Sequence, residues 1–359
     1  MSTGLADNTR IPWSRKLGIA ARDIKLAHSV FAVPFALLGG VLATGLGYGG
    51  VLLVPLPSSG AGSDSPGLSW PDSWDRGYGS LGFKFGLIVV CMVLARTFAM
   101  LMNRFLDRRL DAENPRTAGR AFAANTLSHR DAVIMLAASA SLFAVATAGF
   151  GVFFGNWLPV LAGPVVLGWL AFYSVTKRFT LLCHVVLGIA LALSPIAAAG
   201  AIGGFEAVAF WPRDVVYPGG AAQTYAAGWF DSNADVYTIA LFVAAWVAGF
   251  DVIYAMQDEA FDREKGLHSM PSRLGTAGAA WASRGLHGVA VGAVFAAGVV
   301  SDQLGVLYFV GAGLTAALLI AEHAILAVRG HRSIPMVFFT LNGVVAIVLG
   351  VAGIADVLT

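Results

Sequence analysis

Residues 83–111 read FKFGLIVVCMVLARTFAMLMNRFLDRRLD, an apolar run that passes into a polar helix face. The run is long enough to cross the hydrocarbon core of a bilayer as a helix, and it lacks the alternation of a strand. Near its end, Asn103, Asp107 and Asp111 recur every four residues, so their side chains share one helix face. This stretch predicts a membrane-spanning helix that presents acidic groups at one membrane surface.

The composition of the whole chain agrees with this interpretation. Hydrophobic residues make up 57% of the 359 residues, charged residues only 12%, and the mean hydropathy is +0.73, which excludes an ordinary soluble domain. We expect an all-α membrane protein, a bundle of about nine transmembrane helices rather than a barrel. The expected spans are 27–47, 83–103, 132–150, 157–174, 181–200, 236–254, 280–299, 304–328 and 334–357.

The basic residues predict the orientation of the bundle. Most of the 23 Lys and Arg residues precede the first span or lie in the loops after the second, fourth, sixth and eighth spans. By the positive-inside rule this side is cytoplasmic, so we expect a multi-pass protein of the cytoplasmic (inner) membrane with its N-terminus inside and its C-terminus outside. The net charge of +2 is then a signal of topology, and no nucleic-acid partner is expected.

We expect one domain over residues 1–359. Residues 1–26 carry basic side chains but no apolar core or cleavage site, which indicates a cytoplasmic lead-in rather than a signal peptide. Residues 55–82 and 203–235 are rich in Gly, Pro, Ser and Asp and are expected to form polar inserts on the outer face. Solvated loops are the favoured interpretation of these inserts, and a lid or a partner surface is the alternative.

A second acidic stripe repeats the plan of the first at the end of the sixth expected span. Its members, three or four residues apart, are Asp251, Tyr254, Asp258 and Asp262. Asp251 precedes Asp258 by seven residues, as Arg96 precedes Asn103. Asp and Glu total only 21 residues, so two matching stripes on the cytoplasmic side indicate a ligand site, and we expect them to face each other. A lone stripe of this kind would indicate only a solvated helix face.

Oxygen ligands without nearby His or Cys at zinc spacing favour Mg²⁺, which usually shares its coordination shell with phosphate oxygens. A diphosphate is therefore the expected ligand. The predicted metal residues are Asn103, Asp107, Asp111, Asp258 and Asp262. Four basic residues on the same predicted side would balance the charge of the diphosphate, although the positive-inside bias alone also accounts for them: Arg116, Arg120, Lys177 and Arg178.

Two ionisable residues lie within or at the edge of apolar spans. Arg96 and Asp251 occupy positions where a charge is costly and usually lines a cavity. We expect a functional role for both, with structural pairing as the alternative. His28, His184 and His268 are candidates for acid–base chemistry, although buried structural histidines are the more common case.

Taken together, the motifs resemble those of a known family. They are Arg96-x6-Asn103-x3-Asp107-x3-Asp111, then Asn114-Pro-Arg116-Thr-Ala-Gly-Arg120, and later Asp251-x2-Tyr254-x3-Asp258-x3-Asp262-x3-Gly266-x2-Ser269. This combination resembles the UbiA superfamily of intramembrane aromatic prenyltransferases, in its 4-hydroxybenzoate polyprenyltransferase-like branch, over essentially the whole chain. The resemblance implies a nine-helix bundle that opens sideways to membrane lipid and carries its Asp motifs on cytoplasmic cap loops.

The resemblance also implies a reaction: Mg²⁺-dependent transfer of a polyprenyl group from polyprenyl diphosphate to 4-hydroxybenzoate or a similar hydroxylated aromatic acid, in ubiquinone-type quinone biosynthesis. The predicted catalytic residues are Asp107, Asp111, Asp258, Asp262, Asp251 and Arg96. The predicted substrate-binding residues are Asn103, Arg116, Arg120, Tyr254, Lys177 and Arg178. Of these residues, Arg96, Asp251 and Tyr254 are implied to lie near the aromatic acceptor.

Three positions depart from the family pattern. The stretch Arg120-Ala-Phe-Ala-Ala-Asn125 lacks the prolines and glycine of several members, Arg104 replaces an acidic residue, and His268 replaces a common Lys. Three alternatives also remain for the function. They are prenylation of a dihydroxynaphthoate in menaquinone biosynthesis, transport of a cation or metabolite, and a non-catalytic scaffold.

Overall fold

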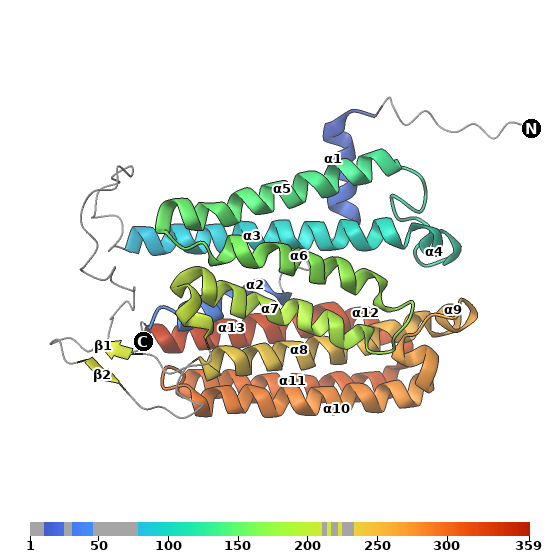
Figure 1. The fold of residues 1–359 in the computed structure, drawn as a ribbon. Helices are drawn as coiled ribbons and strands as arrows, with labels where there is room; N and C mark the ends of the chain where they lie inside the picture. The colour runs from blue at the N-terminus through green and yellow to red at the C-terminus, as the bar shows by residue number, and fades with distance from the viewer. Residues whose placement is uncertain (1–10, 25–30, 46–77, 210–213, 217–221, 225–232) are drawn as a thin grey trace, which may run out of the picture.

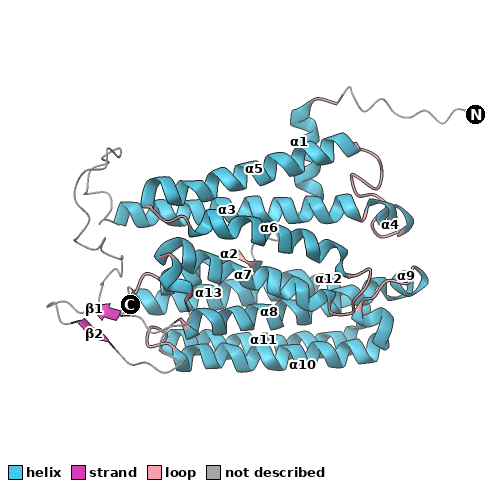
Figure 2. Ribbon diagram, in the orientation of Figure 1, coloured by secondary structure: helices cyan, strands magenta, loops and turns pink. Residues whose placement is uncertain are grey.

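The computed structural model describes residues 11–24, 31–45, 78–209, 214–216, 222–224 and 233–359. These residues form long helices and one short antiparallel hairpin, in which Asp214–Val216 (β1) pairs with Ala222–Thr224 (β2) (Figures 1 and 2). The α-helices are α1 Trp13–Asp23, α2 Val33–Leu42, α3 Tyr78–Leu106, α4 Arg108–Glu113, α5 His129–Phe154, α6 Leu158–Thr176, α7 Cys183–Gly203, α8 Ala234–Ala255, α9 Glu259–Glu264, α10 Met270–Val300, α11 Val306–Arg329, α12 Ile334–Met336 and α13 Asn342–Leu358. The expectation of an all-α membrane bundle is confirmed.

Within the described ranges, seven segments are long and apolar enough to cross a membrane. The last of them, Val306–Leu358, contains both α11 and α13, which pack against each other and correspond to the eighth and ninth expected spans. The shorter apolar helix α2 falls within the first expected span, 27–47, whose ends lie outside the described residues. The helices thus follow the order of the nine expected spans.

The bundle has two sides joined by central helices. Helices α3, α5 and α6 pack together on one side, and α8, α10, α11 and α13 form the other side (Figure 1). Helix α7 packs against both α6 and α8, and α2 packs against α7 and α13. Helices α4 and α9 lie at one end of the bundle, whereas the C-terminus and the β hairpin lie at the opposite end (Figure 1).

The central helices approach closely where glycines leave space. A Cβ atom on Gly188 of α7 would lie 2.1 Å from the carbonyl oxygen of Ala244 in α8, and one on Gly39 of α2 would lie 2.5 Å from that of Pro195 in α7. Small residues at helix crossings are typical of membrane bundles, in which van der Waals packing rather than hydrophobic burial drives association. Helices α2, α7 and α8 are therefore closely packed at the centre of the bundle.

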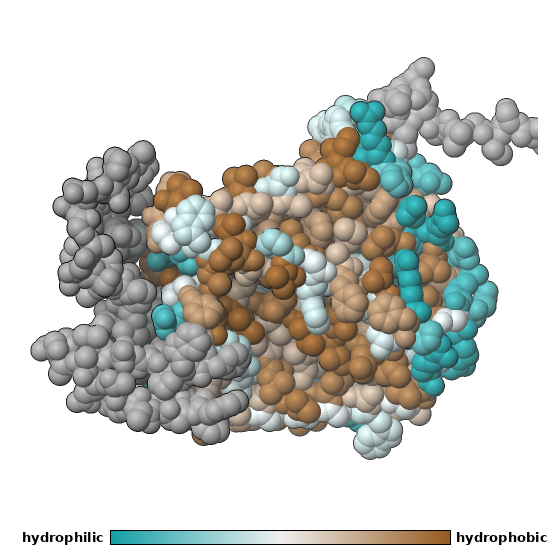
Figure 3. All heavy atoms as spheres, viewed as in Figure 1, coloured by the Kyte–Doolittle hydropathy of each residue, from teal (hydrophilic) through white to brown (hydrophobic). Residues whose placement is uncertain are grey.

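The outer surface matches a lipid environment. Large apolar side chains stay exposed along the outer helices, including Leu161 at 73% and Val299 at 77%. Figure 3 shows a broad hydrophobic belt over the helices and a hydrophilic end over α4 and α9. The chain is therefore a multi-pass membrane protein whose polar end carries both acidic motifs.

The expected insert 55–82 and the expected lead-in 1–26 both contain helical residues. Helix α3 begins at Tyr78, so the last residues of the expected insert 55–82 are helical, and its residues 55–77 lie outside the described residues. The expected lead-in contains the helix α1, which runs across the bundle axis (Figure 1). Lys16 of α1 forms a buried ion pair with Asp131 at the start of α5, with 2.8 Å between Nζ and Oδ1.

We expect Gly188→Ala to destabilise the bundle, because the added methyl group would force α7 away from α8. Overpacking of this kind costs about 1–3 kcal/mol, measurable as a lower midpoint of thermal unfolding in detergent. Gly168 of α6 provides the matched control, since a Cβ there meets no described atom within 4 Å. Gly168→Ala should keep or raise the midpoint, and equal losses in both variants would contradict the packing argument.

Candidate active site

Both acidic motifs extend across a junction between a long helix and a short one. Helix α3 ends at Leu106 and α4 follows, with Asp107 at the junction. Helix α8 ends at Ala255, and a 3₁₀ turn that closes with Asp258 leads into α9. Each junction redirects the chain across the end of the bundle, so the acidic side chains are gathered at one end instead of continuing along the span axis (Figure 1).

Each of the four aspartates predicted as metal ligands is paired with one of the predicted basic residues. Asp107 accepts a hydrogen bond from Arg178 at 3.0 Å, Asp111 pairs with Arg120 at 2.6 Å, Asp262 pairs with Lys177 at 2.7 Å, and Asp258 pairs with Arg116. Lys177 and Arg178 follow α6 directly, and they reach one motif each. The turn between α6 and α7 therefore ties the two motifs together.

Asp258 has the densest set of partners in this network. The Arg116 guanidinium approaches it with two nitrogens and also donates to the Tyr254 hydroxyl at 3.0 Å. The Asn114 amide donates to Asp258 at 3.0 Å. Burial lowers the pKa of Arg116, but the bonded carboxylate outweighs it, so the net shift is upward and the side chain stays cationic. The segment after α4 is thus fastened to the second motif.

The pKa of Asp107 is shifted by two opposing effects. Burial raises its pKa above the ordinary value of an aspartate, and the bond from Arg178 offsets this only in part. Asn103, one turn earlier, donates its amide to Asp107 at 3.2 Å. Further positive charge brought to this partly buried carboxylate would stabilise its ionised form.

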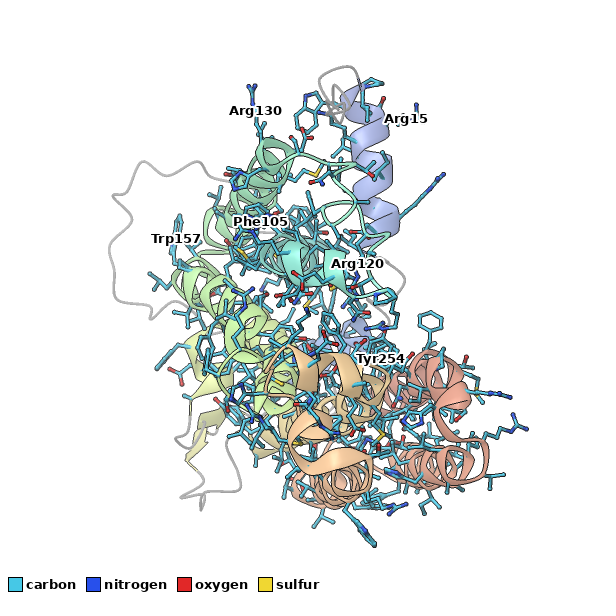
Figure 4. All side chains as sticks on the ribbon, turned by 90° about the vertical axis from the view of Figure 1, so that its right-hand side faces the viewer. Arg15, Phe105, Arg120, Arg130, Trp157 and Tyr254 are labelled. Atoms are coloured by element: carbon cyan, nitrogen blue, oxygen red, sulfur yellow. The ribbon has the colours of Figure 1, made fainter. Side chains whose placement is uncertain are left out.

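A cavity of about 710 Å³ opens among these residues and continues between the helices. Its polar end is lined by the motif aspartates and their basic partners. Further along, it is lined by Arg96, Asp251 and Tyr254, and beyond them by apolar or small residues such as Phe150 and Ala201. Figure 4 looks onto the polar end, with Arg120 and Tyr254 in its central region. All twelve residues predicted for the site line this one cavity.

The two deeper ionisable residues have different surroundings. Arg96 lines the cavity from α3, and its Nε atom is buried without a hydrogen-bond partner within the described part of the chain. Asp251 bonds to His184 of α7, with 2.6 Å between Oδ2 and Nδ1. His184 also lines the cavity, which sequence reasoning named only as one of three candidate histidines.

Sequence reasoning missed two polar contacts of the motifs. Asn114 bonds to Asp258, and Ser269 donates its hydroxyl to Asp262 at 2.7 Å. Both residues stand inside the motif stretches, three residues after Asp111 and seven after Asp262, and this spacing was the available signal. The side chain of His268, by contrast, makes no bond to either motif among the described residues. Its backbone N–H donates to the carbonyl oxygen of Lys177 at 2.7 Å.

Two of the three departures from the family pattern lie against α1. Ala121, Phe122 and Ala123 are buried, and the first two join a hydrophobic cluster with Ala20 of α1. Arg104 lies with its Nε 3.8 Å from Asp23, also in α1. The first residues of the loop after Arg120 are thus apolar and buried.

The donor set suits a hard divalent cation. Every predicted ligand offers oxygen, and Asp111 keeps one buried carboxylate oxygen, Oδ2, that has no hydrogen-bond partner among the described residues. The described residues do not bring three His, Cys, Asp or Glu side chains together as a ready metal site, because each aspartate lies against a basic side chain. By ligand chemistry the residues fit Mg²⁺.

Comparisons with known proteins agree with this architecture. The 4-hydroxybenzoate octaprenyltransferase of Hahella chejuensis is 27% identical over 270 residues, which cover 74% of this chain and 79% of that protein. The apo structure of a UbiA homolog from Aeropyrum pernix K1 superposes with a TM-score of 0.67 and 27% identity, covering 92% of this chain and 98% of the homolog.

A more distant structure, a UbiA homolog from Archaeoglobus fulgidus bound to GPP and Mg²⁺, shares the fold with a TM-score of 0.60 at 17% identity, over 94% of this chain and 99% of the homolog. The model of the UbiA prenyltransferase family matches residues 73–344, well over half of the sequence. The chain, with its paired acidic motifs at one end of a helical membrane bundle, therefore belongs to the UbiA prenyltransferase family.

Proposed function

We propose that this prenyltransferase transfers a polyprenyl group from polyprenyl diphosphate to 4-hydroxybenzoate or a similar hydroxylated aromatic acid, as a step of ubiquinone-type quinone biosynthesis. The observation that carries the proposal is the single cavity that joins a charged end to an apolar interior. A polyprenyl diphosphate has the same division, with an anionic head and a long hydrocarbon tail. The names of relatives such as the Hahella chejuensis octaprenyltransferase support the choice of acceptor.

The charged end is proposed to hold the diphosphate together with Mg²⁺. Asn103, Asp107, Asp111, Asp258 and Asp262 would hold the metal. Bound there, Mg²⁺ would supply positive charge that stabilises the departing diphosphate. We propose that four basic residues also bond phosphate oxygens, and their ion pairs with these aspartates support this: Arg116, Arg120, Lys177 and Arg178.

The proposed reaction is an electrophilic aromatic substitution. The allylic C–O bond breaks, and its electron pair leaves with the diphosphate. A ring carbon ortho to the acceptor hydroxyl forms the new C–C bond, and loss of the ring proton restores aromaticity. The fixed guanidinium and ammonium groups stabilise the leaving charge, while the apolar walls of the cavity keep water away from the allylic cation.

The acceptor is proposed to lie between the charged end and the apolar interior. Arg96 has a guanidinium nitrogen that is buried without a partner in the described chain, and an aromatic carboxylate would supply one. Asp251 and Tyr254 line the same part of the cavity from α8. We propose that these three residues orient the acceptor ring.

The positive-inside pattern supports a cytoplasmic location for the end that carries α4 and α9. The diphosphate and the polar acceptor would then enter from the cytoplasm of a cell whose inner membrane holds the bundle. The hydrocarbon tail would stay in contact with lipid, because a long polyprenyl chain is insoluble in water.

We expect Asp107→Asn and Asp258→Asn each to lower Mg²⁺-dependent prenyl transfer by about 100-fold or more, because each removes a charged oxygen ligand beside the leaving group. The assay measures prenylated product in membranes, with EDTA to remove divalent cations and Mg²⁺ to restore them. Glu264→Ala is the control, since this exposed acidic residue on α9 does not line the cavity. Full transfer in EDTA, or unchanged transfer in both variants, would refute the metal assignment.

We expect the protein to form a prenylated product from 4-hydroxybenzoate at a higher kcat/KM than from a dihydroxynaphthoate. The measurement offers each acceptor separately to the purified protein with Mg²⁺ and a long polyprenyl diphosphate, and detects product by mass spectrometry. Product from the dihydroxynaphthoate and none from 4-hydroxybenzoate would replace the proposed acceptor with the menaquinone-route alternative. The absence of product with every acceptor would reject the proposed function.

A further inference from the structure

A buried histidine lies behind the acceptor region of the cavity. His184 is the second residue of α7 and only 2% exposed. Its Nδ1 atom lies 2.6 Å from Oδ2 of Asp251, 67 residues away in α8. Its other ring nitrogen, Nε2, lies 3.3 Å from the backbone nitrogen of Met270 at the start of α10. The imidazole therefore joins three helices at one point.

The two contacts assign the proton of the imidazole ring. The backbone N–H of Met270 can only donate, so Nε2 must accept and carries no proton. The proton of the neutral ring is then on Nδ1, which donates to the Asp251 carboxylate. The backbone of α10 thus selects the tautomer that bonds to Asp251, as a second partner commonly does for histidines in functional sites.

Burial shows which member of the pair faces the cavity. The side chain of His184 is 3% exposed and that of Asp251 is 18% exposed, although both line the cavity. The carboxylate therefore stands in front, and the imidazole supports it from behind. A carboxylate with one oxygen fixed by a buried donor presents its other oxygen in a defined direction.

We propose that His184 is a positioning residue: it fixes the Asp251 carboxylate so that this group accepts a hydrogen bond from the hydroxyl of the aromatic acceptor. This inference rests on the proposed function. A carboxylate that accepts a hydrogen bond from the hydroxyl group raises the electron density of the aromatic ring. The increase reaches the carbon ortho to the hydroxyl group, which is the carbon that attacks. His184 touches neither substrate, and its effect passes through Asp251.

The test uses two substitutions of the same residue. His184→Asn keeps an amide N–H near the position of Nδ1, whereas His184→Leu removes the donor but keeps an apolar side chain of substantial size. A matched control is His287→Leu in α10, because His287 is another buried histidine, 3% exposed, that bonds to His323 and does not line the cavity. The probes are geranyl diphosphate and 4-hydroxybenzoate, with Mg²⁺, and the thermal midpoint of each variant is recorded.

We expect His184→Leu to lower kcat with 4-hydroxybenzoate by about 10- to 100-fold, the effect of losing one hydrogen bond to a charged group. The KM for geranyl diphosphate should not change, because the charged end of the cavity is untouched. His184→Asn should recover most of kcat. His287→Leu should keep kcat even where its thermal midpoint falls.

Three outcomes would overturn the inference while the wild-type protein is active. They are an unchanged kcat in His184→Leu, no recovery in His184→Asn, and a loss in His287→Leu equal to that in His184→Leu. An inactive wild-type protein with every acceptor would instead reject the proposed function, and the role of His184 with it. The two failures are therefore distinguishable in one set of assays.

Discussion

The pairing of four aspartates with four basic side chains is the interaction on which the polar end of this bundle depends. Ionised groups are costly to place near a membrane interior, and a buried ion pair rarely repays the full loss of hydration. These pairs nevertheless join three separate turns of the chain, after α3, α6 and α8. We interpret these ion pairs as a preformed binding site for a charged ligand, and not as a source of folding stability. A diphosphate and its metal ion carry charges of opposite sign. On binding, the aspartates could therefore contact the metal ion, and the basic side chains could contact the diphosphate.

The cavity exists because other parts of the bundle pack more tightly. Gly39 and Gly188 let α2, α7 and α8 approach to backbone contact, which fills the centre of the molecule on one side of α7. On the other side, α7 meets α6, and the space between α3, α5, α6 and α8 stays open as the cavity. Dense packing and open volume are thus divided between two faces of one helix.

Much of this arrangement follows from the sequence, and the remainder does not. The spans, the helical ends and the acidic stripes are local patterns, so hydropathy and four-residue spacing were enough to predict them. The bond between Asn114 and Asp258 joins residues 144 apart, and no local pattern encodes such a distance. Helix α1 was not predicted because it is short and mixes polar with apolar residues, and it is held by the tertiary contact of Lys16 with Asp131. The proposed role of His184 depends likewise on contacts of its two ring nitrogens with α8 and α10.

The spacing of the motifs along their helices supports two binding levels for the proposed reaction, one for the diphosphate and one for the acceptor. Arg96 precedes Asn103 by seven residues within α3, and Asp251 precedes Asp258 by seven residues along α8 and its closing turn. Seven residues at the helical rise correspond to about 10 Å. Both sides of the cavity therefore carry an outer polar level and, about two helical turns deeper, an inner polar level. A diphosphate held at the outer level would direct its first carbon inward, toward an aromatic ring held at the inner level. The tail must then turn away from the acceptor into the apolar part of the cavity, which continues past Asp251 toward Phe150. A cavity with two polar levels and an apolar extension thus suits the proposed transfer from a lipid donor to a small polar acceptor.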